Sequence, residues 1–271
     1  MKTILCPVDL TVFSDLTARY AAQIARDTRS RVVLVAASAG KKAALAGDWS
    51  EDKSELTDRL EELHDILKGD YQVACGIQEE VISDNVYKRL NLLADEHDIT
   101  ILGMHSNQRA LPTHAGGLDL IKMIRSALAP LLIVPEGYEY ARVRRLLYAF
   151  DYKHEPTPPM NQLRWLTGWF GADLKFVSVI DTNMPARDRD NVAAIEHRIA
   201  AEWPDRDRLV FENIAFDDVT ECLELYANLW KPGDLMVLSV NHRNMLEKIW
   251  HQSLVKRLLK RADHPYLIIH K

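Results

Sequence analysis

A few polar residues and glycines in the N-terminal half stand where their chemistry suits a phosphorylated ligand. Asp9 directly follows the apolar run Ile4–Val8, and Gly103 ends a second apolar run that begins at Ile99. Gly116-Gly117 opens a helical pattern. Glycine lets a backbone approach a ligand closely, and the amide groups that open a helix attract phosphate. These residues predict a ligand-binding site at one edge of a sheet. The alternative is that Asp9 is a carboxylate at a strand end and that the glycines belong to ordinary turns.

The same pattern of apolar runs, strand-end aspartates and prolines occurs twice along the chain, which predicts a duplicated domain. Asp9 and Asp151 each end an apolar strand pattern and stand 142 positions apart. Pro130 and Pro265 each precede a closing apolar run and stand 135 positions apart. We therefore expect an N-terminal domain over residues 1–137 and a C-terminal domain over residues 143–271, joined by a short linker marked by proline and glycine.

Within each half, apolar runs alternate with stripes of helical spacing. The first half predicts strands at Ile4–Val8, Arg31–Ala36, Tyr71–Cys75, Ile99–Leu102 and Leu131–Val134. The second half predicts them at Leu146–Phe150, Leu174–Ile180, Leu209–Ile214, Leu235–Val240 and Tyr266–Ile269. Continuous rather than alternating apolar strands indicate sheets covered on both faces. The expected fold class is α/β, with two tandem doubly wound domains, each a five-stranded parallel sheet flanked by helices.

Composition narrows the functional classes. The chain has 271 residues, 47% of them hydrophobic, and a formal net charge of −5, which disfavours a nucleic-acid partner. No apolar run approaches the roughly 20 residues that span a bilayer, so no membrane role is expected. Cys6, Cys75 and Cys222 are scattered and odd in number, which favours free thiols in a reducing cytoplasm.

On these residues, the chain resembles the universal stress protein family in its tandem form. Pro7-Val8-Asp9-Leu10-Thr11, continuing to Ala18-Arg19-Tyr20-Ala21, resembles the family's opening strand, loop and helix. The ATP-binding members carry a glycine, two residues, a glycine, nine residues, and then glycine with serine or threonine. Gly103 and Gly116 match the first and third glycines; Ser106 replaces the second, and Gly117 replaces the serine or threonine.

The resemblance implies a Rossmann-like domain of the adenine nucleotide α-hydrolase type and a site in the first half. Asp9 would contact the adenine end, and the glycine loop would wrap the ribose and phosphates. The implied nucleotide-binding residues are Asp9, Thr11, Gly103, His105, Ser106, Gly116 and Gly117. The cofactor would be ATP or another adenine nucleotide. Losing the serine or threonine hydroxyl removes one phosphate contact, so this site departs in part from the family pattern.

The second half departs further. Its matching loop begins Ser239-Val240-Asn241-His242, and only the final serine, Ser253, survives from the motif. Without glycines, side chains fill the space that a phosphate needs, so we expect a degenerate copy that binds no nucleotide. The two loops contain four histidines that could bind a metal, namely His105, His114, His242 and His251. The sequence lacks the residue spacing of zinc sites, so we expect no metal site.

The expected protein is a cytoplasmic, stress-related regulatory module rather than an enzyme, with slow ATP hydrolysis left open. The alternative is a nucleotide-free dimeric interaction scaffold of the same family. Leu131–Val134 and Tyr266–Ile269 are apolar closing strands that suit pairing across chains in a homodimer, or with each other in an intramolecular pseudo-dimer. The Ser106 and Gly117 departures favour the scaffold, whereas Asp9, Gly103 and Gly116 favour nucleotide binding.

Overall fold

The computed structural model describes residues 1–8, 12–37, 49–82, 86–104, 120, 123–124, 127, 129–153, 157–227, 229–240, 257–259 and 262–271. By contacts, these residues form two compact units. The first unit comprises Met1–Arg142 with Val240–His270, and the second comprises Val143–Ser239. The domain limits inferred from the repeat remain a prediction, because compactness describes packing and not the ancestry of the two halves.

The first unit alternates strands and helices, as its apolar pattern predicts. Its strands are β1 (Thr3–Val8), β2 (Arg31–Ala37), β3 (Ala74–Ile82), β4 (Ile99–Met104), β5 (Leu131–Pro135) and β10 (Tyr266–His270). Its helices are α1 (Val12–Thr28), α2 (Trp49–Gly69) and α3 (Val86–Asp95). The strand order is β3-β2-β1-β4-β5-β10. The first five strands run parallel, and β10 pairs antiparallel with β5.

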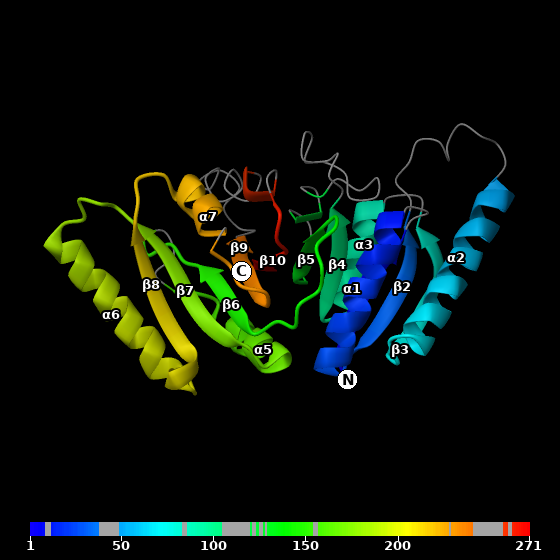
Figure 1. Cartoon of the computed structure of the whole chain (residues 1–271), viewed down its shortest axis with the longest axis horizontal. Coiled ribbons are helices and arrows are strands. Elements are labelled where there is room, and N and C mark those ends of the chain that lie inside the picture. The colour runs from blue at the N-terminus through cyan, green and yellow to red at the C-terminus, as the bar shows by residue number, and fades with distance from the viewer. Residues whose placement is uncertain are drawn as a thin grey trace. The chain divides into compact units, whose positions relative to one another are not determined.

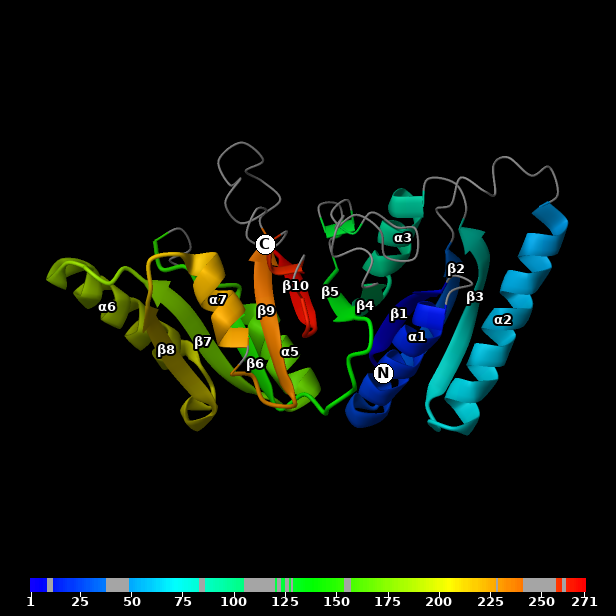
Figure 2. The ribbon, with the colours of Figure 1, turned by 45° about the horizontal axis from the view of Figure 1, so that its top comes forward.

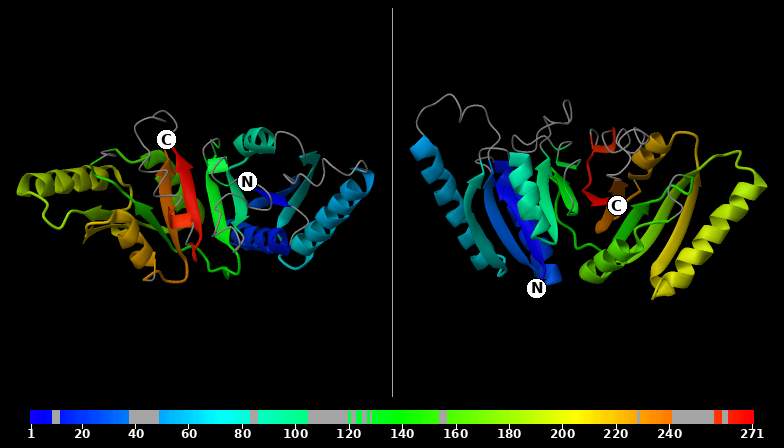
Figure 3. Two further views of the ribbon diagram at one scale, coloured as in Figure 1. Left: turned by 90° about the horizontal axis from the view of Figure 1, so that it is seen from above. Right: turned by 180° about the vertical axis from the view of Figure 1, so that it is seen from behind.

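Helices cover both faces of this sheet (Figure 1). α1 lies in front of the strands, whereas α3 lies behind them, as the reverse view of Figure 3 also shows. Asp15 of α1 and Arg59 of α2 form an ion pair, so these two helices share a face. α1 packs closely on the sheet because its inward face carries small side chains, the buried Ala18, Ala21, Ala22 and Ala25.

The second unit repeats the parallel arrangement (Figure 2). Its strands are β6 (Arg145–Ala149), β7 (Asp173–Ile180), β8 (Leu209–Ala215) and β9 (Asp234–Val240), in the order β9-β6-β7-β8. Its helices are α5 (Met160–Phe170), α6 (Ala186–Glu202), the one-turn η2 (Arg206–Arg208) and α7 (Val219–Ala227). α5 ends at Gly171, whose φ of 63° lies in the left-handed region that glycine adopts without strain. The α/β class with mostly parallel, helix-flanked sheets is therefore confirmed.

The core is made of the apolar strand residues that the sequence pattern selects. In the first unit, Ile4, Leu5, Ile99, Ile101 and Leu132 are fully buried. Among the helices described, none has the length and apolar character needed to cross a bilayer.

Candidate functional site

The carboxyl edge of the first sheet has its topological switch between β1 and β4. These strands are parallel neighbours, with Ile4 opposite Ile99 and Leu5 opposite Thr100. From β1 the chain continues to β2 and β3 on one side, whereas β4 leads to β5 on the other. In open α/β sheets, ligands bind beyond the strand ends where the direction of winding reverses. The edge formed by Val8 and Met104 is therefore the expected position for a ligand.

Of the predicted nucleotide-binding residues, the structure describes Gly103. It lies in β4 opposite Val134 and is half-buried at the carboxyl edge. The others, Asp9, Thr11, His105, Ser106, Gly116 and Gly117, lie outside the described residues. The structure does bring together the two strand ends that lead into this set, since Asp9 follows β1 and His105 follows β4.

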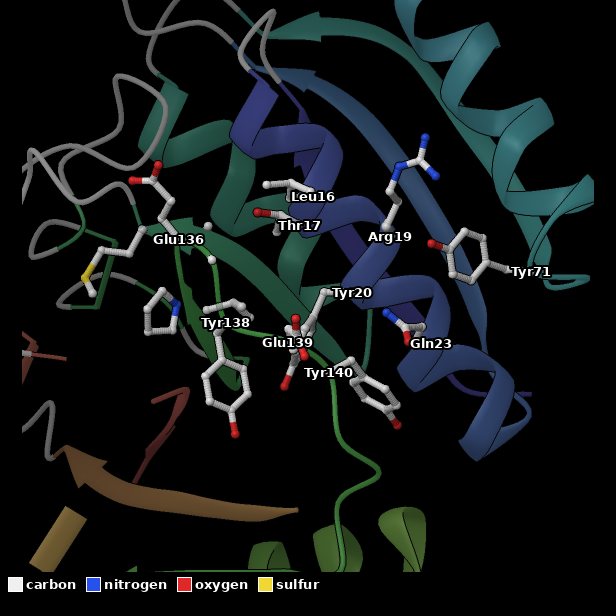
Figure 4. Close-up of a pocket in the computed structure, with 15 residues that line it drawn as sticks. Leu16, Thr17, Arg19, Tyr20, Gln23, Tyr71, Glu136, Tyr138, Glu139 and Tyr140 are labelled. Atoms are coloured by element: carbon white, nitrogen blue, oxygen red, sulfur yellow. The ribbon is translucent and has the colours of Figure 1, made fainter. Parts of the chain in front are cut away.

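A cavity of about 420 Å³ opens beside Gly103 in the first unit (Figure 4). This volume lies within the roughly 300–1,000 Å³ of small-molecule pockets. Three parts of the chain line it: α1, the end of β4, and the segment that leaves β5. Tyr71, which follows α2, completes the rim. The lining residues are Leu16, Thr17, Arg19, Tyr20, Gln23, Tyr71, Gly103, Met104, Val134, Pro135, Glu136, Gly137, Tyr138, Glu139 and Tyr140.

A glycine turn forms the far wall of this cavity. Glu136 N donates to Met104 O at 2.8 Å, and Tyr138 N donates to Pro135 O at 3.2 Å across the turn. Gly137, with φ of 75°, occupies the position at which a side chain is strained. The turn ends β5 and directs the following residues back along α1.

Three tyrosines cluster at the lower end of the cavity. The ring of Tyr140 lies edge-on to that of Tyr20, with centroids 5.2 Å apart, and the Tyr138 ring lies 6.3 Å from Tyr20. The Tyr140 hydroxyl donates to Asp27 Oδ2 at 2.7 Å. The sequence pattern predicts a linker for this segment. The alternating tyrosines at 138 and 140 were the only signal that it packs against the first unit.

The phenols of Tyr20 and Tyr140 are neutral at physiological pH. Burial, followed by the neighbouring Tyr138, raises the pKa of Tyr20 well above its ordinary range. Burial and the bond to Asp27 raise the pKa of Tyr140 in the same direction. The cavity thus offers aromatic faces, hydroxyls, carboxylates, one carboxamide and one guanidinium. Such groups can bind and orient a ligand, and the lining residues that the structure describes include neither histidine nor cysteine as a base or nucleophile.

The matching edge of the second unit is packed with side chains. β6 and β9 are parallel neighbours there, and Ser239 stands where Gly103 stands in the first half. Ser239 is buried, and its Oγ lies 3.0 Å from the hydroxyl of Tyr148. The ring of Phe176 lies 5.4 Å from that of Tyr148 and 5.3 Å from that of Phe150. Rings and a bonded hydroxyl thus occupy positions adjoining this edge.

Asp151, the counterpart of Asp9, has a local partner. Its Oδ1 accepts a hydrogen bond of 3.0 Å from the backbone N–H of Lys153. This pattern is that of an Asx turn, in which the side chain organises its own loop. The next residue, Tyr152, donates to Glu196 Oε1 at 2.7 Å and lines a separate cavity of about 550 Å³ against α6.

Metal ligands do not gather in the part of the chain that the structure describes, where no group of three or more His, Cys, Asp or Glu is close enough. The loop histidines His105, His114, His242 and His251 lie outside that part.

Comparison with known proteins agrees with this architecture. The sequence model of the universal stress protein family matches residues 1–135. A universal stress protein from Archaeoglobus fulgidus DSM 4304 has a similar structure, with a TM-score of 0.68 and 11% identity over 99% of this chain and 96% of that one. A functionally unknown protein from Pseudomonas aeruginosa PAO1 has a TM-score of 0.59 and 15% identity over 100% and 92% of the two chains. At these identities the likeness concerns the fold.

No curated protein sequence is significantly similar to the chain. The family match falls on the half that carries Asp9, Gly103 and Gly116, and the structural likeness extends over the whole chain. Through its first 135 residues, the chain belongs to the universal stress protein family.

Proposed function

We propose that the chain is a stress-related regulatory protein that holds an adenine nucleotide, ATP or AMP, at the carboxyl edge of the first unit. The observation that carries this proposal is the pairing of β1 with β4, because both arms of the family's nucleotide motif start from these two strands. Half-buried Gly103 at the end of β4 allows a ligand to approach the backbone.

The remaining roles come from the family resemblance. Asp9 and Thr11 would receive the adenine end, and the chain from Gly103 through His105 and Ser106 would hold the ribose. Gly116 and Gly117 would present amide groups to the phosphates. Ser106 adopts a positive φ less readily than glycine, and Gly117 lacks a hydroxyl, so we expect weaker binding than in members with the complete motif.

The expected activity is binding rather than turnover. The residues assigned to the nucleotide above include no lysine or arginine. Fast phosphoryl transfer needs groups that position water and neutralise developing charge. Slow ATP hydrolysis is compatible with this proposal.

The second half is proposed to bind no nucleotide. Its matching strand end carries the buried Ser239, bonded to Tyr148, in place of a glycine. Asp151 is engaged by its own loop. The function would then be asymmetric, with one ligand per chain.

Mass spectrometry of small molecules released from protein purified without added nucleotide tests the proposal, followed by calorimetric titration with ATP and AMP. One equivalent per chain is expected. Asp9→Ala should weaken binding at least about tenfold, as loss of a charged hydrogen bond does. Asp151→Ala is the matched control and should leave affinity unchanged. If neither Asp9→Ala nor Gly116→Leu altered a measured affinity, the placement of the site would be wrong.

A nucleotide-free scaffold is the second candidate, and the pairing of β5 with β10 favours one form of it. Leu132 lies opposite Leu267 in this antiparallel pair, so the edge of β5 already has a partner within the chain. A homodimer through that edge would require β10 to leave. The scaffold is therefore proposed as an intramolecular pseudo-dimer, supported if no nucleotide co-purifies and light scattering gives the mass of one chain.

A cytoplasmic location is part of the same proposal. All three cysteines are free, and burial raises the pKa of the Cys6 thiol to about 12. Buried, protonated thiols suit a reducing compartment.

A further inference from the structure

The cavity beside Gly103 has a chemistry of its own, distinct from that of a phosphate site. Along its lower wall run the aromatic rings of Tyr20, Tyr138 and Tyr140. Two carboxylates, Glu136 and Glu139, come from the same turn that carries Tyr138. The Glu139 carboxylate would repel a phosphate and attract a cation.

Electrostatic balance in the cavity favours a cation. Figure 4 shows the guanidinium of Arg19 on the Tyr71 side of α1, pointing away from Glu139 and Tyr138. Glu139 is exposed and forms no ion pair with any described residue. Its charge is therefore available to a ligand, and Arg19 does not neutralise it.

Aromatic rings add a directional attraction. A cation within about 6 Å of a ring centroid is drawn to the electron-rich face. Tyr138 is half-buried, so part of its surface remains accessible, whereas Tyr20 is buried beneath it. A cavity dominated by arginines or backbone amides would favour an anion, and one with apolar walls alone would favour a neutral ligand. Rings beside carboxylates are the combination that recognises organic ammonium groups.

We propose that this cavity binds a small organic ammonium cation, with the Tyr138 ring and the Glu139 carboxylate as its principal contacts. The ligand sits between α1 and the turn at Gly137, in the cavity that Met104 and Val134 also line. This site is separate from the proposed nucleotide loop, which extends from the strand ends at Val8 and Met104. The two share Gly103 at their boundary.

Choline is a suitable probe, because 3,3-dimethylbutan-1-ol has the same shape and hydroxyl with a neutral carbon in place of the nitrogen. The full chain is titrated with each compound at constant ionic strength, by calorimetry and by saturation-transfer NMR. Choline should bind at least about fivefold more tightly than the neutral compound. Equal affinities, or no choline binding at millimolar concentration, would overturn the proposal.

Variants locate the contacts. Glu139→Gln should weaken choline binding about threefold to fivefold, whereas Glu61→Gln on the exposed face of α2 should not change it. Tyr138→Leu should weaken binding about fivefold, and Tyr138→Phe, which keeps the ring, should preserve it. Choline binding that survives both Glu139→Gln and Tyr138→Leu unchanged would place the cation elsewhere and refute this site.

Failure here is distinguishable from failure of the nucleotide proposal. Asp9→Ala should weaken the ATP response and leave choline binding intact, because the proposed contacts of choline are Tyr138 and Glu139. Loss of choline binding in Asp9→Ala would indicate that the nucleotide and choline use the same site, which would contradict a separate ammonium site.

Discussion

The Tyr140 hydroxyl donates a 2.7 Å hydrogen bond to Asp27 Oδ2, joining residues 113 positions apart. Asp27 lies near the end of α1, and Tyr140 belongs to the segment that leaves the first sheet. Together with the ring contact to Tyr20, this bond fixes that segment along the helix that lines the cavity. The segment is thus part of the first unit's packing rather than a free tether.

Tyr140→Phe should lower the free energy of unfolding by about 1–2 kcal/mol, because the ring contact remains and the bond to a carboxylate is lost. Urea denaturation of the full chain measures the change. Asp27→Ala serves as the second arm of a double-mutant cycle, and a coupling free energy near 1 kcal/mol is expected. Additive effects of the two substitutions would show that the bond contributes nothing to stability.

The carboxylate of Asp98 links the loop before β4 to the start of β1. It accepts from Lys2 Nζ at 2.9 Å and from the Thr3 backbone N–H at 2.8 Å. Burial acts to raise the pKa of this carboxyl, but the bonds from Lys2 and Thr3 prevail and hold the pKa below its ordinary 3.8. A depressed folded-state pKa means that the stabilisation is complete above the unfolded-state pKa and is lost as pH falls through the folded-state value.

Asp98→Asn should therefore destabilise the protein by about 1 kcal/mol at pH 7. The difference from the unchanged chain should shrink as the pH falls below 3.8. Urea midpoints at pH 7, 5 and 3 measure it, with the exposed Asp95→Asn as control. A stability difference that stays constant across this pH range would show that the negative charge of Asp98 does not contribute to stability.

Much of the strand framework follows from apolar runs, but β3 shows where such reasoning stops. The sequence predicts a strand over Tyr71–Cys75, whereas β3 spans Ala74–Ile82. Gln72 adopts a positive φ of 55°, which breaks the extended backbone at that point. β3 is also the edge of its sheet, so polar residues such as Gln78 are tolerated within it. The apolar-run criterion therefore shifts the strand toward the N-terminus.

Long-range packing escaped prediction for a different reason. The cavity depends on Tyr20 meeting Tyr138 and Tyr140, more than a hundred positions away, and no periodicity encodes that encounter. The predicted nucleotide-binding residues rest on the motif and the family resemblance. Of these the structure describes Gly103, so the predictions for Asp9 and the glycine loop remain to be tested by binding measurements.

Ser239→Gly tests whether restoring a glycine restores a site in the second half. We expect no second equivalent of nucleotide, because the rings of Tyr148, Phe150 and Phe176 still adjoin that edge. The variant should also lose about 1 kcal/mol of stability, since the hydrogen bond between the Tyr148 hydroxyl and Ser239 Oγ is lost. Calorimetric stoichiometry with ATP gives the answer, and two equivalents per chain would contradict the degenerate reading.

The last strand, β10, completes the first unit although it comes from the end of the sequence. Leu267 is fully buried and lies opposite Leu132 of β5. His270 Nε2 lies 2.7 Å from the carbonyl oxygen of Ile124, a second contact to the N-terminal half. Leu267→Ala removes buried methyl groups and should lower the free energy of unfolding by about 2–5 kcal/mol. Leu229→Ala is the matched control, because Leu229 is 72% exposed, and it should cost less than about 0.5 kcal/mol.

Hydrogen exchange shows where the effect of Leu267→Ala falls. If β10 stabilises the first unit, amide protons of Leu131–Val134 in β5 should exchange faster in this variant, because the strand pair opens more often. Amides of β7 in the second unit, such as those of Phe176 and Val177, then serve as an internal reference. Equally faster exchange in β7 would show that the substitution destabilises the chain as a whole and does not act through the pairing of β10 with β5. Faster exchange confined to β5 would show that β10 stabilises the sheet of the first unit.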